Sequence, residues 1–234
     1  MDWKNQCVAV VPCFDEAGRV GATVSGALLH VASVIVVDDG SGDGTAAEAG
    51  GAGARVVRHD CNRGKGAAVR TGLVEALRGG YSWAVLLDGD GQHRPEDIQS
   101  LFACAGSTGA DLVVGDRSGG FGGMSWLRRW VNRCMSWEIS RVTGQALRDT
   151  QCGLRLIRLE AWRQVPLESE HFEIESEMVV GFVRGGYRVR FAPVQTVPQS
   201  RASRIHPVVD TVRWLRWRLA LESRPERGRA CPQT

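Results

Sequence analysis

Short apolar runs alternate with helix-like segments along the first half of the chain, and this alternation limits the fold most. The apolar runs are residues 8–12, 33–39, 54–59, 83–88 and 110–116. Runs of this length that are apolar almost throughout are typical of parallel strands buried on both faces. Helical patterns separate them, at residues 16–29, from Thr45, at 65–78 and at 95–105. The sequence therefore predicts an α/β fold with a doubly wound, mostly parallel sheet and helices on both faces.

The second half of the chain is less regular. Residues 149–158 are predicted as a strand entered from a polar turn, residues 187–198 as a strand that ends in prolines, and residues 172–184 as a helix. Residues 125–142 and 205–221 place Trp, Arg and aliphatic side chains at helical spacing, which predicts two amphipathic helices. Such helices either lie on an anionic membrane surface or pack on the domain with Trp214 and Trp217 in its core.

Length and composition predict one soluble or peripheral domain. The chain has 234 residues, of which 43% are hydrophobic and 24% charged, enough to bury a core. Its apolar runs are far shorter than the ~18 residues of a spanning helix, and the run after Cys7 is too short for a signal peptide. The seven cysteines include no C-x-x-C pair, which predicts buried free thiols in a reducing, cytoplasmic compartment.

Acidic and polar residues follow four of the predicted strands. The strand ends read PCFDE (12–16), DDGSGDGT (38–45), DGDGQH (88–93) and GDR (115–117). Ligands of doubly wound sheets bind beyond the carboxyl ends of the strands. Four such ends at one edge are more than turn formation requires, so the sequence predicts a binding site there.

Asp88 and Asp90 stand one residue apart after the fourth predicted strand. Asp and Gly are ordinary turn residues, so a turn is one interpretation. The other is a metal site, because carboxylates at i and i+2 of an extended segment point the same way and repel each other without a cation. Mg²⁺ and Mn²⁺ prefer oxygen ligands of this kind.

Two glycine-rich stretches invite comparison with known phosphate loops. GSGDGT (40–45) does not match G-x-G-x-x-G, and NRGKGAAVRTG (62–72) lacks the Ser or Thr that follows GK in a Walker motif. Gly64 and Gly66 still lead into a predicted helix. Either they form a simple loop-to-helix turn, or free backbone N–H groups there bind an anion.

Several stretches together match a known family. They are VVPCFDEAGRV (10–20), IVVDDGSGDGT (35–45), NRGKGAAVRTG (62–72), LLDGDGQHRPEDI (86–98), GDR (115–117), DTQCGLRLIR (149–158), FEIESEM (172–178) and SRASRIHP (200–207). In this order the chain resembles the family 2 glycosyltransferases with the GT-A fold. It looks most similar to the polyprenyl-phosphate, or dolichyl-phosphate, mannosyl- and glucosyltransferases. The resemblance covers about Val10 to Arg213, and DGDGQH and DTQCGLRL are its most specific parts.

The resemblance implies roles on the donor side. Pro12, Phe14 and Glu16 would line the base pocket, and Asp39 would contact the base or ribose. Asp88 would lie near the ribose, and Lys65, one of only two lysines, would face the phosphates. Asp90 and Gln92 would hold a Mg²⁺ or Mn²⁺ ion. The family often has Tyr-Asn where this chain has Phe14-Asp15, which keeps stacking but loses a hydroxyl contact.

The resemblance also implies roles on the acceptor side. The arginines expected to neutralise the acceptor phosphate are Arg117, Arg129, Arg133, Arg201 and Arg204. The residues expected to take part in catalysis are Asp90, Arg117, Asp149 and Glu175. Asp149 and Glu175 either act as base or positioning groups, or have a structural part in which Asp149 caps a turn and Glu175 pairs with an Arg.

We therefore expect an inverting, metal-dependent hexosyltransferase that uses a GDP-mannose- or UDP-glucose-type donor and a polyprenyl-phosphate acceptor. The alternatives are the same chemistry on a saccharide or lipid hydroxyl, and a non-catalytic nucleotide-sugar-binding or membrane scaffold protein. We expect one GT-A domain over 1–222, with a nucleotide-sugar-binding half (1–117), an acceptor half with amphipathic helices (118–222) and a flexible basic tail (223–234). Many relatives carry C-terminal spanning helices and this sequence shows none, so we expect peripheral contact with the cytoplasmic face of the membrane and no nucleic-acid partner. The sequence indicates no oligomeric state.

Overall fold

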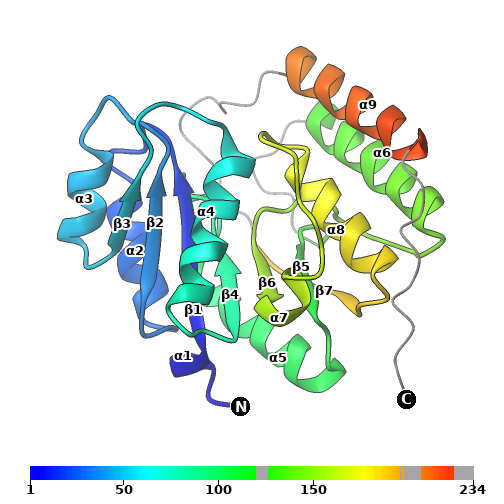
Figure 1. Cartoon of the computed structure of the whole chain (residues 1–234). Helices are drawn as coiled ribbons and strands as arrows, with labels where there is room; N and C mark the ends of the chain where they lie inside the picture. Colours follow the sequence, from blue (N-terminus) through cyan, green and yellow to red (C-terminus); the bar gives the residue numbers. More distant parts are fainter. Residues whose placement is uncertain (120–125, 196, 198–206, 224–234) are drawn as a thin grey trace.

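The apolar runs of the first half form the parallel part of a single seven-stranded sheet. The computed structural model describes residues 1–119, 126–195, 197 and 207–223. The strands of this part are β1 (Cys7–Cys13), β2 (Val34–Asp38), β3 (Arg55–Arg58) and β4 (Trp83–Leu86). In β1, the residues from Val8 to Val11 are fully buried, because helices cover both faces of the sheet. Figure 1 shows α4 in front of this part and α2 behind it.

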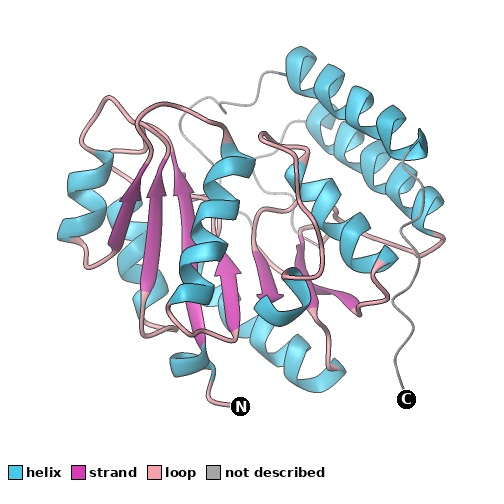
Figure 2. Ribbon diagram, viewed as in Figure 1, coloured by secondary structure: helices cyan, strands magenta, loops and turns pink. Residues whose placement is uncertain are grey.

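The other part of the sheet contains the strand that breaks the parallel pattern. It consists of β5 (Leu112–Asp116), β6 (Arg155–Arg158) and β7 (Val189–Pro193). The strand order is β3-β2-β1-β4-β6-β5-β7, and β6 runs antiparallel to both of its neighbours. The predicted mostly parallel, doubly wound α/β fold is therefore confirmed, with β6 as the exception (Figure 2).

The described helices flank the sheet in two layers. Their bounds are α1 (Trp3–Gln6), α2 (Val20–Leu28), α3 (Thr45–Gly51), α4 (Lys65–Arg78), α5 (Ile98–Thr108), α6 (Trp126–Thr143), α7 (Leu159–Trp162), α8 (Ile174–Arg184) and α9 (Pro207–Ser223). Helix α4 lies very close to β1, because a Cβ atom at Gly72 would lie 2.3 Å from Val10 Cγ1. This glycine therefore lets α4 bring its first residue, Lys65, to the edge of the sheet.

Two predicted elements begin later than the sequence pattern indicates. The helix expected from Glu16 starts at Val20, because Asp15 has a φ of 46° and the Glu16 N–H donates to Thr45 Oγ1 at 2.7 Å instead of entering a helix. The strand expected over 149–158 is strand only from Arg155. Residues 149–154 form a loop instead, which the side chain of Arg155 holds from inside the fold.

Helices α6 and α9 lie side by side at one end of the molecule (Figure 1). Arg218 of α9 donates to Glu138 of α6 at 2.9 Å. Trp214 of α9 is buried, whereas Trp126, Trp130 and Trp137 of α6 are exposed, so only part of the predicted apolar set faces the core. Within the described ranges, no helix combines the length and the apolar character that crossing a membrane requires.

The six described cysteines are all free thiols, but only some of them are buried. Cys7, Cys13 and Cys152 lie in the core, and burial raises the pKa of the Cys152 thiol to about 12. Cys61 and Cys134 are exposed, so the prediction of buried thiols is wrong for these two. Cys61 lies in a loop and Cys134 on the exposed side of α6.

Candidate active site at the carboxyl edge of the sheet

The loops after β1 and β2 are tied together at the carboxyl edge of the sheet. The Asp15 N–H donates to Ser41 Oγ at 2.8 Å, and the Gly42 N–H donates to Asp15 Oδ1 at 2.9 Å. Phe14 is half-buried between these loops and Glu16 is buried beside Arg19, with which it forms an ion pair. Phe14 and Glu16, two of the predicted base-pocket residues, therefore lie in the loop after β1, which is hydrogen-bonded to the loop after β2.

Asp39 has protein partners on both of its carboxylate oxygens. Oδ1 lies 2.6 Å from His59 Nδ1 and accepts the N–H of Arg63, and Oδ2 accepts the N–H of Gly64 at 2.8 Å. His59 Nε2 in turn lies 3.0 Å from Thr71 Oγ1 on α4. Asp39 thus fixes the loop before α4, and its contact with a base or ribose stays a prediction. His59 was not predicted, since nothing in its sequence surroundings distinguishes it.

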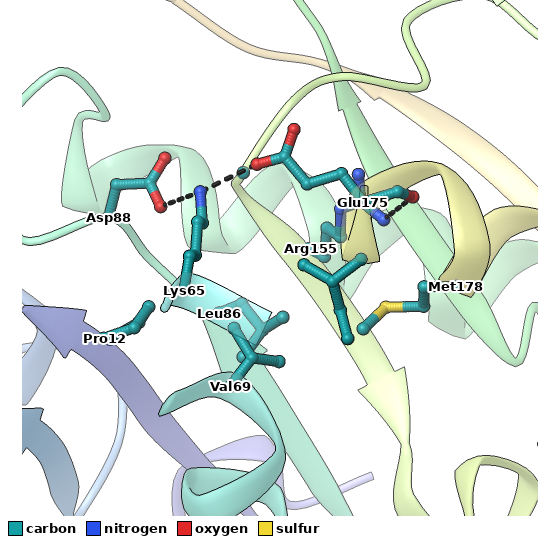
Figure 3. Close-up of a pocket in the computed structure, with 10 residues that line it drawn as sticks. Pro12, Lys65, Val69, Leu86, Asp88, Arg155, Glu175 and Met178 are labelled. Carbon is teal, nitrogen blue, oxygen red and sulfur yellow. Dashed lines mark hydrogen bonds and ion pairs between the residues drawn. The ribbon is translucent and has the colours of Figure 1, made fainter. Parts of the chain in front are cut away.

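Lys65, Asp88 and Glu175 meet in one ion-pair cluster, although they come from distant parts of the chain (Figure 3). Lys65 Nζ lies 2.6 Å from Asp88 Oδ1 and 2.7 Å from Glu175 Oε1. Burial acts to lower the pKa of Lys65, but the two carboxylates outweigh it and raise that pKa. Burial likewise acts to raise the pKa of Asp88, but Lys65 and His93 hold it well below its ordinary value. The pKa shifts of Lys65 and Asp88 therefore both favour the charged forms of these two side chains.

This cluster closes a small cavity of about 10 Å³. The lining residues are Pro12, Lys65, Val69, Leu86, Asp88, Gly153, Arg155, Ile174, Glu175 and Met178. The structure thus brings four predicted site residues together, Pro12, Lys65, Asp88 and Glu175. Sequence reasoning missed Arg155 and Gly153 as individual site residues, although both lie in the DTQCGLRLIR stretch that carried much of the resemblance.

Asp90 and Gln92 lie in the turn after β4, next to this cluster. The Gln92 N–H donates to Asp90 Oδ1 at 2.9 Å. Burial and the neighbouring charge of Asp88 raise the pKa of Asp90, as expected for two close carboxylates without a cation. The described residues contain no group of three or more His, Cys, Asp and Glu side chains that could hold a metal alone. The oxygen donors of Asp90 and Gln92 fit Mg²⁺ or Mn²⁺, provided that a substrate supplies the remaining ligands.

Arg117 and Asp149 form a buried, two-point ion pair. Arg117 Nε and Nη2 donate to the two oxygens of Asp149 at 2.7 and 2.8 Å, and both side chains are buried. Asp149 also accepts the Gln151 N–H at 3.3 Å, as its turn-capping alternative predicts, whereas Glu175 pairs with Lys65 and not with an Arg. Arg117 is equally engaged, so its expected contact with an acceptor phosphate stays a prediction.

Of the other arginines predicted for the acceptor phosphate, the two that the structure describes do not line the cavity. Arg129 is half-buried and Arg133 exposed, both on α6. Arg201 and Arg204 lie outside the described residues, as does the tail from residue 224 onward. The predicted acceptor set is thus divided between a helix at the far side of the site and a segment of which nothing is described.

Gly64 and Gly66, at the start of α4, allow the backbone to pack closely against residues 169–171. The N–H groups of Gly66 and Ala67 both donate to the carbonyl of Glu170, at 2.7 and 3.3 Å. A Cβ atom at Gly66 would lie 2.2 Å from the carbonyl oxygen of Ser169. The N–H groups that an anion would need are therefore taken by the chain itself, which favours the loop-to-helix interpretation of Gly64 and Gly66.

Solved structures of similar fold support this picture of the architecture. The structure overlaps with glucosyl-3-phosphoglycerate synthase of Mycobacterium tuberculosis, crystallised with Mn²⁺ and UDP-glucose, with a TM-score of 0.72. The match covers 92% of this chain and 79% of that chain at 19% identity, so it shows the shared GT-A fold.

Curated relatives are similar at the level of sequence. Polyprenol monophosphomannose synthase of Mycolicibacterium smegmatis is 28% identical over 81% of this chain and 77% of its own length. Dodecaprenyl-phosphate galacturonate synthase of Rhizobium johnstonii is 33% identical over 74% of this chain. The chain spans about half of that second relative, 54% of its length.

One family model covers most of the sheet. The model described as glycosyl transferase family 2 matches residues 8–165, a range that contains β1 except for Cys7, all of β2 to β6, and Lys65, Asp88 and Asp90. The fold, the carboxylate turn after β4 and the relatives agree with this match. The chain is a glycosyltransferase and belongs to glycosyl transferase family 2.

Proposed function

We propose that the chain is an inverting, metal-dependent transferase that moves a hexose from a nucleoside-diphosphate sugar to a polyprenyl phosphate. The observation that carries the proposal is the ion-pair cluster of Lys65, Asp88 and Glu175 beside the Asp90 turn. Two named relatives, a polyprenol monophosphomannose synthase and a dodecaprenyl-phosphate galacturonate synthase, support the acceptor class. A donor of GDP-mannose or UDP-glucose type fits the expectation from the sequence.

On the donor side, different residues would contact different parts of the nucleoside-diphosphate sugar. Phe14 and Glu16 would border the base, and Asp88 the ribose. Lys65 would exchange one of its two carboxylate partners for the diphosphate when the donor binds. A Mg²⁺ or Mn²⁺ ion held by Asp90 and Gln92 would supply positive charge that stabilises the departing diphosphate. We assign this half of the chemistry to residues 1–117.

On the acceptor side, a phosphate monoester needs no general base. Its second pKa is about 6, so it is already ionised at neutral pH. This agrees with the pairing of Asp149 to Arg117 and of Glu175 to Lys65, because neither carboxylate is free to take a proton from a hydroxyl. A hydroxyl acceptor would require one of them to leave its cation. We assign acceptor binding to residues 118–222.

A lipid acceptor implies contact with a membrane surface, and we assign that contact to α6 and α9. The exposed Trp126, Trp130 and Trp137 lie at helical spacing on α6, and Leu215 and Leu219 are exposed on α9. Trp side chains are typical of the membrane interface, and Arg side chains can reach anionic headgroups. We propose peripheral association of this face with the cytoplasmic side of the membrane.

The acceptor class is tested by comparing two lipids that differ by one group. Purified protein is given a donor, Mg²⁺ or Mn²⁺, and a short polyprenyl phosphate or the matching polyprenol, with release of nucleoside diphosphate as the readout. We expect release that requires the phosphate and that EDTA abolishes. Equal release with the polyprenol would instead identify a hydroxyl acceptor, and release that survives EDTA would contradict the metal assignment.

A further inference from the structure

Arg155 is the largest fully buried side chain near the cavity, with 1% of its surface exposed. It begins β6, and Figure 3 shows its side chain beside Glu175 in the wall of the cavity. Its nitrogen atoms donate to three backbone carbonyls, those of Cys152 at 2.8 Å, Glu175 at 2.6 Å and Thr150 at 2.9 Å. One side chain therefore joins a loop and the start of α8.

This arrangement is energetically unusual for a buried charge. No carboxylate lies within ion-pair distance of Arg155 among the residues that the structure describes. A buried cation without such a partner is costly, and the three hydrogen bonds to backbone carbonyls offset part of that cost. Burial accordingly lowers the pKa of Arg155, while Glu175, Asp149 and Asp88 act in the opposite direction from farther away. Arg155 therefore binds the backbone around the cavity and does not act as a member of an ion pair.

The three carbonyls share one property, which is that each belongs to a residue at or next to the site. Thr150 follows Asp149, the partner of Arg117. Cys152 precedes Gly153, which touches Asp88 so closely that a Cβ atom there would lie 2.2 Å from Asp88 Oδ2. Glu175 itself binds Lys65 through its carboxylate. The guanidinium group of Arg155 therefore holds the backbone of residues 150–152 and of Glu175, which form the side of the cavity next to the ion-pair cluster.

We propose that Arg155 is a positioning residue for the transfer reaction. It holds segment 149–153 and the backbone of Glu175 at a fixed distance from Asp88 and Lys65, and so sets the geometry in which donor and acceptor meet. This inference rests on the proposed function. Arg155 acts through its neighbours and is not assigned any contact with the reacting atoms.

The test compares R155K and R155M with a control, R188M. Arg188 also donates to backbone carbonyls, those of Thr108 at 2.6 Å and Gly109 at 3.5 Å, but it lies outside the cavity lining and outside α6 and α9. Because small misplacements at a reacting centre can lower rates about 100-fold, we expect kcat to fall about 100-fold in R155M and about tenfold in R155K. The donor KM should stay within about threefold in both, and R188M should keep kcat within about threefold of the wild type.

A second measurement separates positioning from folding. Hydrogen exchange should show lost protection in residues 149–153 and 174–178 of R155K, with β1, β2 and α4 unchanged. Wild-type kcat in a folded R155M, or unchanged exchange at these segments, would overturn the proposal. Failure of R155K to fold would also overturn it, since Arg155 would then be a folding residue. A wild type that releases no nucleoside diphosphate with any donor would count against the proposed function instead, and the exchange pattern would still show whether Arg155 fixes this wall.

Discussion

Asp88 and Asp90 are separated by one residue, and their surroundings shift their pKa values in opposite directions. Asp88 shares Lys65 with Glu175, and the cation holds the pKa of Asp88 low. In the turn the Gln92 N–H donates to Asp90, and burial and Asp88 raise the pKa of Asp90. A divalent cation bound by Asp90 would relieve this repulsion. The difference between the two carboxylates is therefore what the metal assignment predicts.

Replacing Asp90 by Ala should remove turnover without unfolding the protein. We expect kcat to fall at least about 100-fold, the scale seen when one charge-stabilising group is removed. The thermal midpoint should not decrease, because the substitution removes a carboxylate that Asp88 destabilises. Release of nucleoside diphosphate measures the first effect and calorimetry the second, with E160Q on the exposed face of α7 as the control. Metal-dependent turnover in D90A would contradict the assignment.

Replacing Lys65 by Met should destabilise the fold strongly. The side chains of Asp88 and Glu175 are 26% and 11% exposed, and they would face each other without a cation. Breaking a buried ion pair by removing one partner costs about 3–5 kcal/mol, and we expect the lower end because Asp88 is partly exposed. Urea unfolding measures the loss. Lys4 is the other lysine of the chain and is exposed, so K4M is the matched control and should change stability by less than about 0.5 kcal/mol. Equal stability of K65M and K4M would show that the cluster contributes nothing to the fold.

At the scale of elements, the α6–α9 pair connects the outer surface with the site. Ser136 of α6 and Thr150 share a hydrogen bond at 3.1 Å, and Trp214 of α9 donates to Ser176 of α8 at 2.8 Å. Gln151 closes the network by donating to both Thr150 and Ser176. The network thus reaches the neighbours of Asp149 and Glu175 from the two helices that carry the exposed Trp residues.

The ion pairs of Glu138 should make this helix pair sensitive to acid. Hydrogen bonds from Arg141, and then from Arg218, lower the pKa of Glu138 from 4.5 to about 2. A carboxyl group with a lowered pKa in the folded state stabilises the protein above its unfolded pKa, and that contribution disappears as the pH falls toward 2. Between about pH 5 and pH 2, the wild type should therefore lose more stability than E138Q. Urea unfolding across this range measures the difference, and parallel curves for the two proteins would contradict the pairing.

The exposed face of α6 should bind anionic membranes through its Trp side chains. Inserting two Trp side chains into the interface provides more than 1.4 kcal/mol, so the double variant W130S/W137S should bind vesicles at least about tenfold more weakly. Cosedimentation with vesicles of phosphatidylglycerol measures this binding. Leu29 is 73% exposed at the end of α2, so L29S is the control for losing an exposed apolar side chain elsewhere. Equal weakening by L29S would locate the membrane contact outside α6 and α9.

At the scale of the whole molecule, the alternation of apolar runs and helical patterns was enough to predict a mostly parallel sheet. It did not predict the antiparallel strand β6 in the middle of the sheet. Buried parallel strands such as β1 and β2 are apolar on both faces, and that pattern survives in sequence. Strand β6 inserts between β4 and β5 in the opposite direction, and no local pattern specifies the direction of a strand. The full length of the loop at 149–154 was not predicted, for a related reason. Its carbonyls bind the side chain of Arg155, which only the tertiary structure brings beneath them.

The site was predictable where the position of a residue in the predicted elements already places it at the edge of the sheet. Lys65 starts a helix after a loop and Asp88 lies in the turn after a strand, and in the structure the two form an ion pair. Partners that depend on packing were not predictable, as in the contact of His59 with Asp39 or the pairing of Arg117 with Asp149. The resemblance assigned roles to Asp39 and Arg117, but it did not indicate that both would be engaged by protein groups.

The proposed transfer of a sugar to a polyprenyl phosphate can be tested by analysing the lipid product. Purified protein is incubated with a short polyprenyl phosphate, Mg²⁺ or Mn²⁺, and in turn UDP-glucose, UDP-galactose, UDP-N-acetylglucosamine and GDP-mannose, and the lipid fraction is analysed by mass spectrometry. The account predicts a sugar–phosphate–lipid with one of these donors, formed only when the metal is present. Nucleoside diphosphate released without any glycosylated lipid phosphate would contradict the proposed acceptor, and a folded protein that gives neither product would contradict the proposed transfer from these donors.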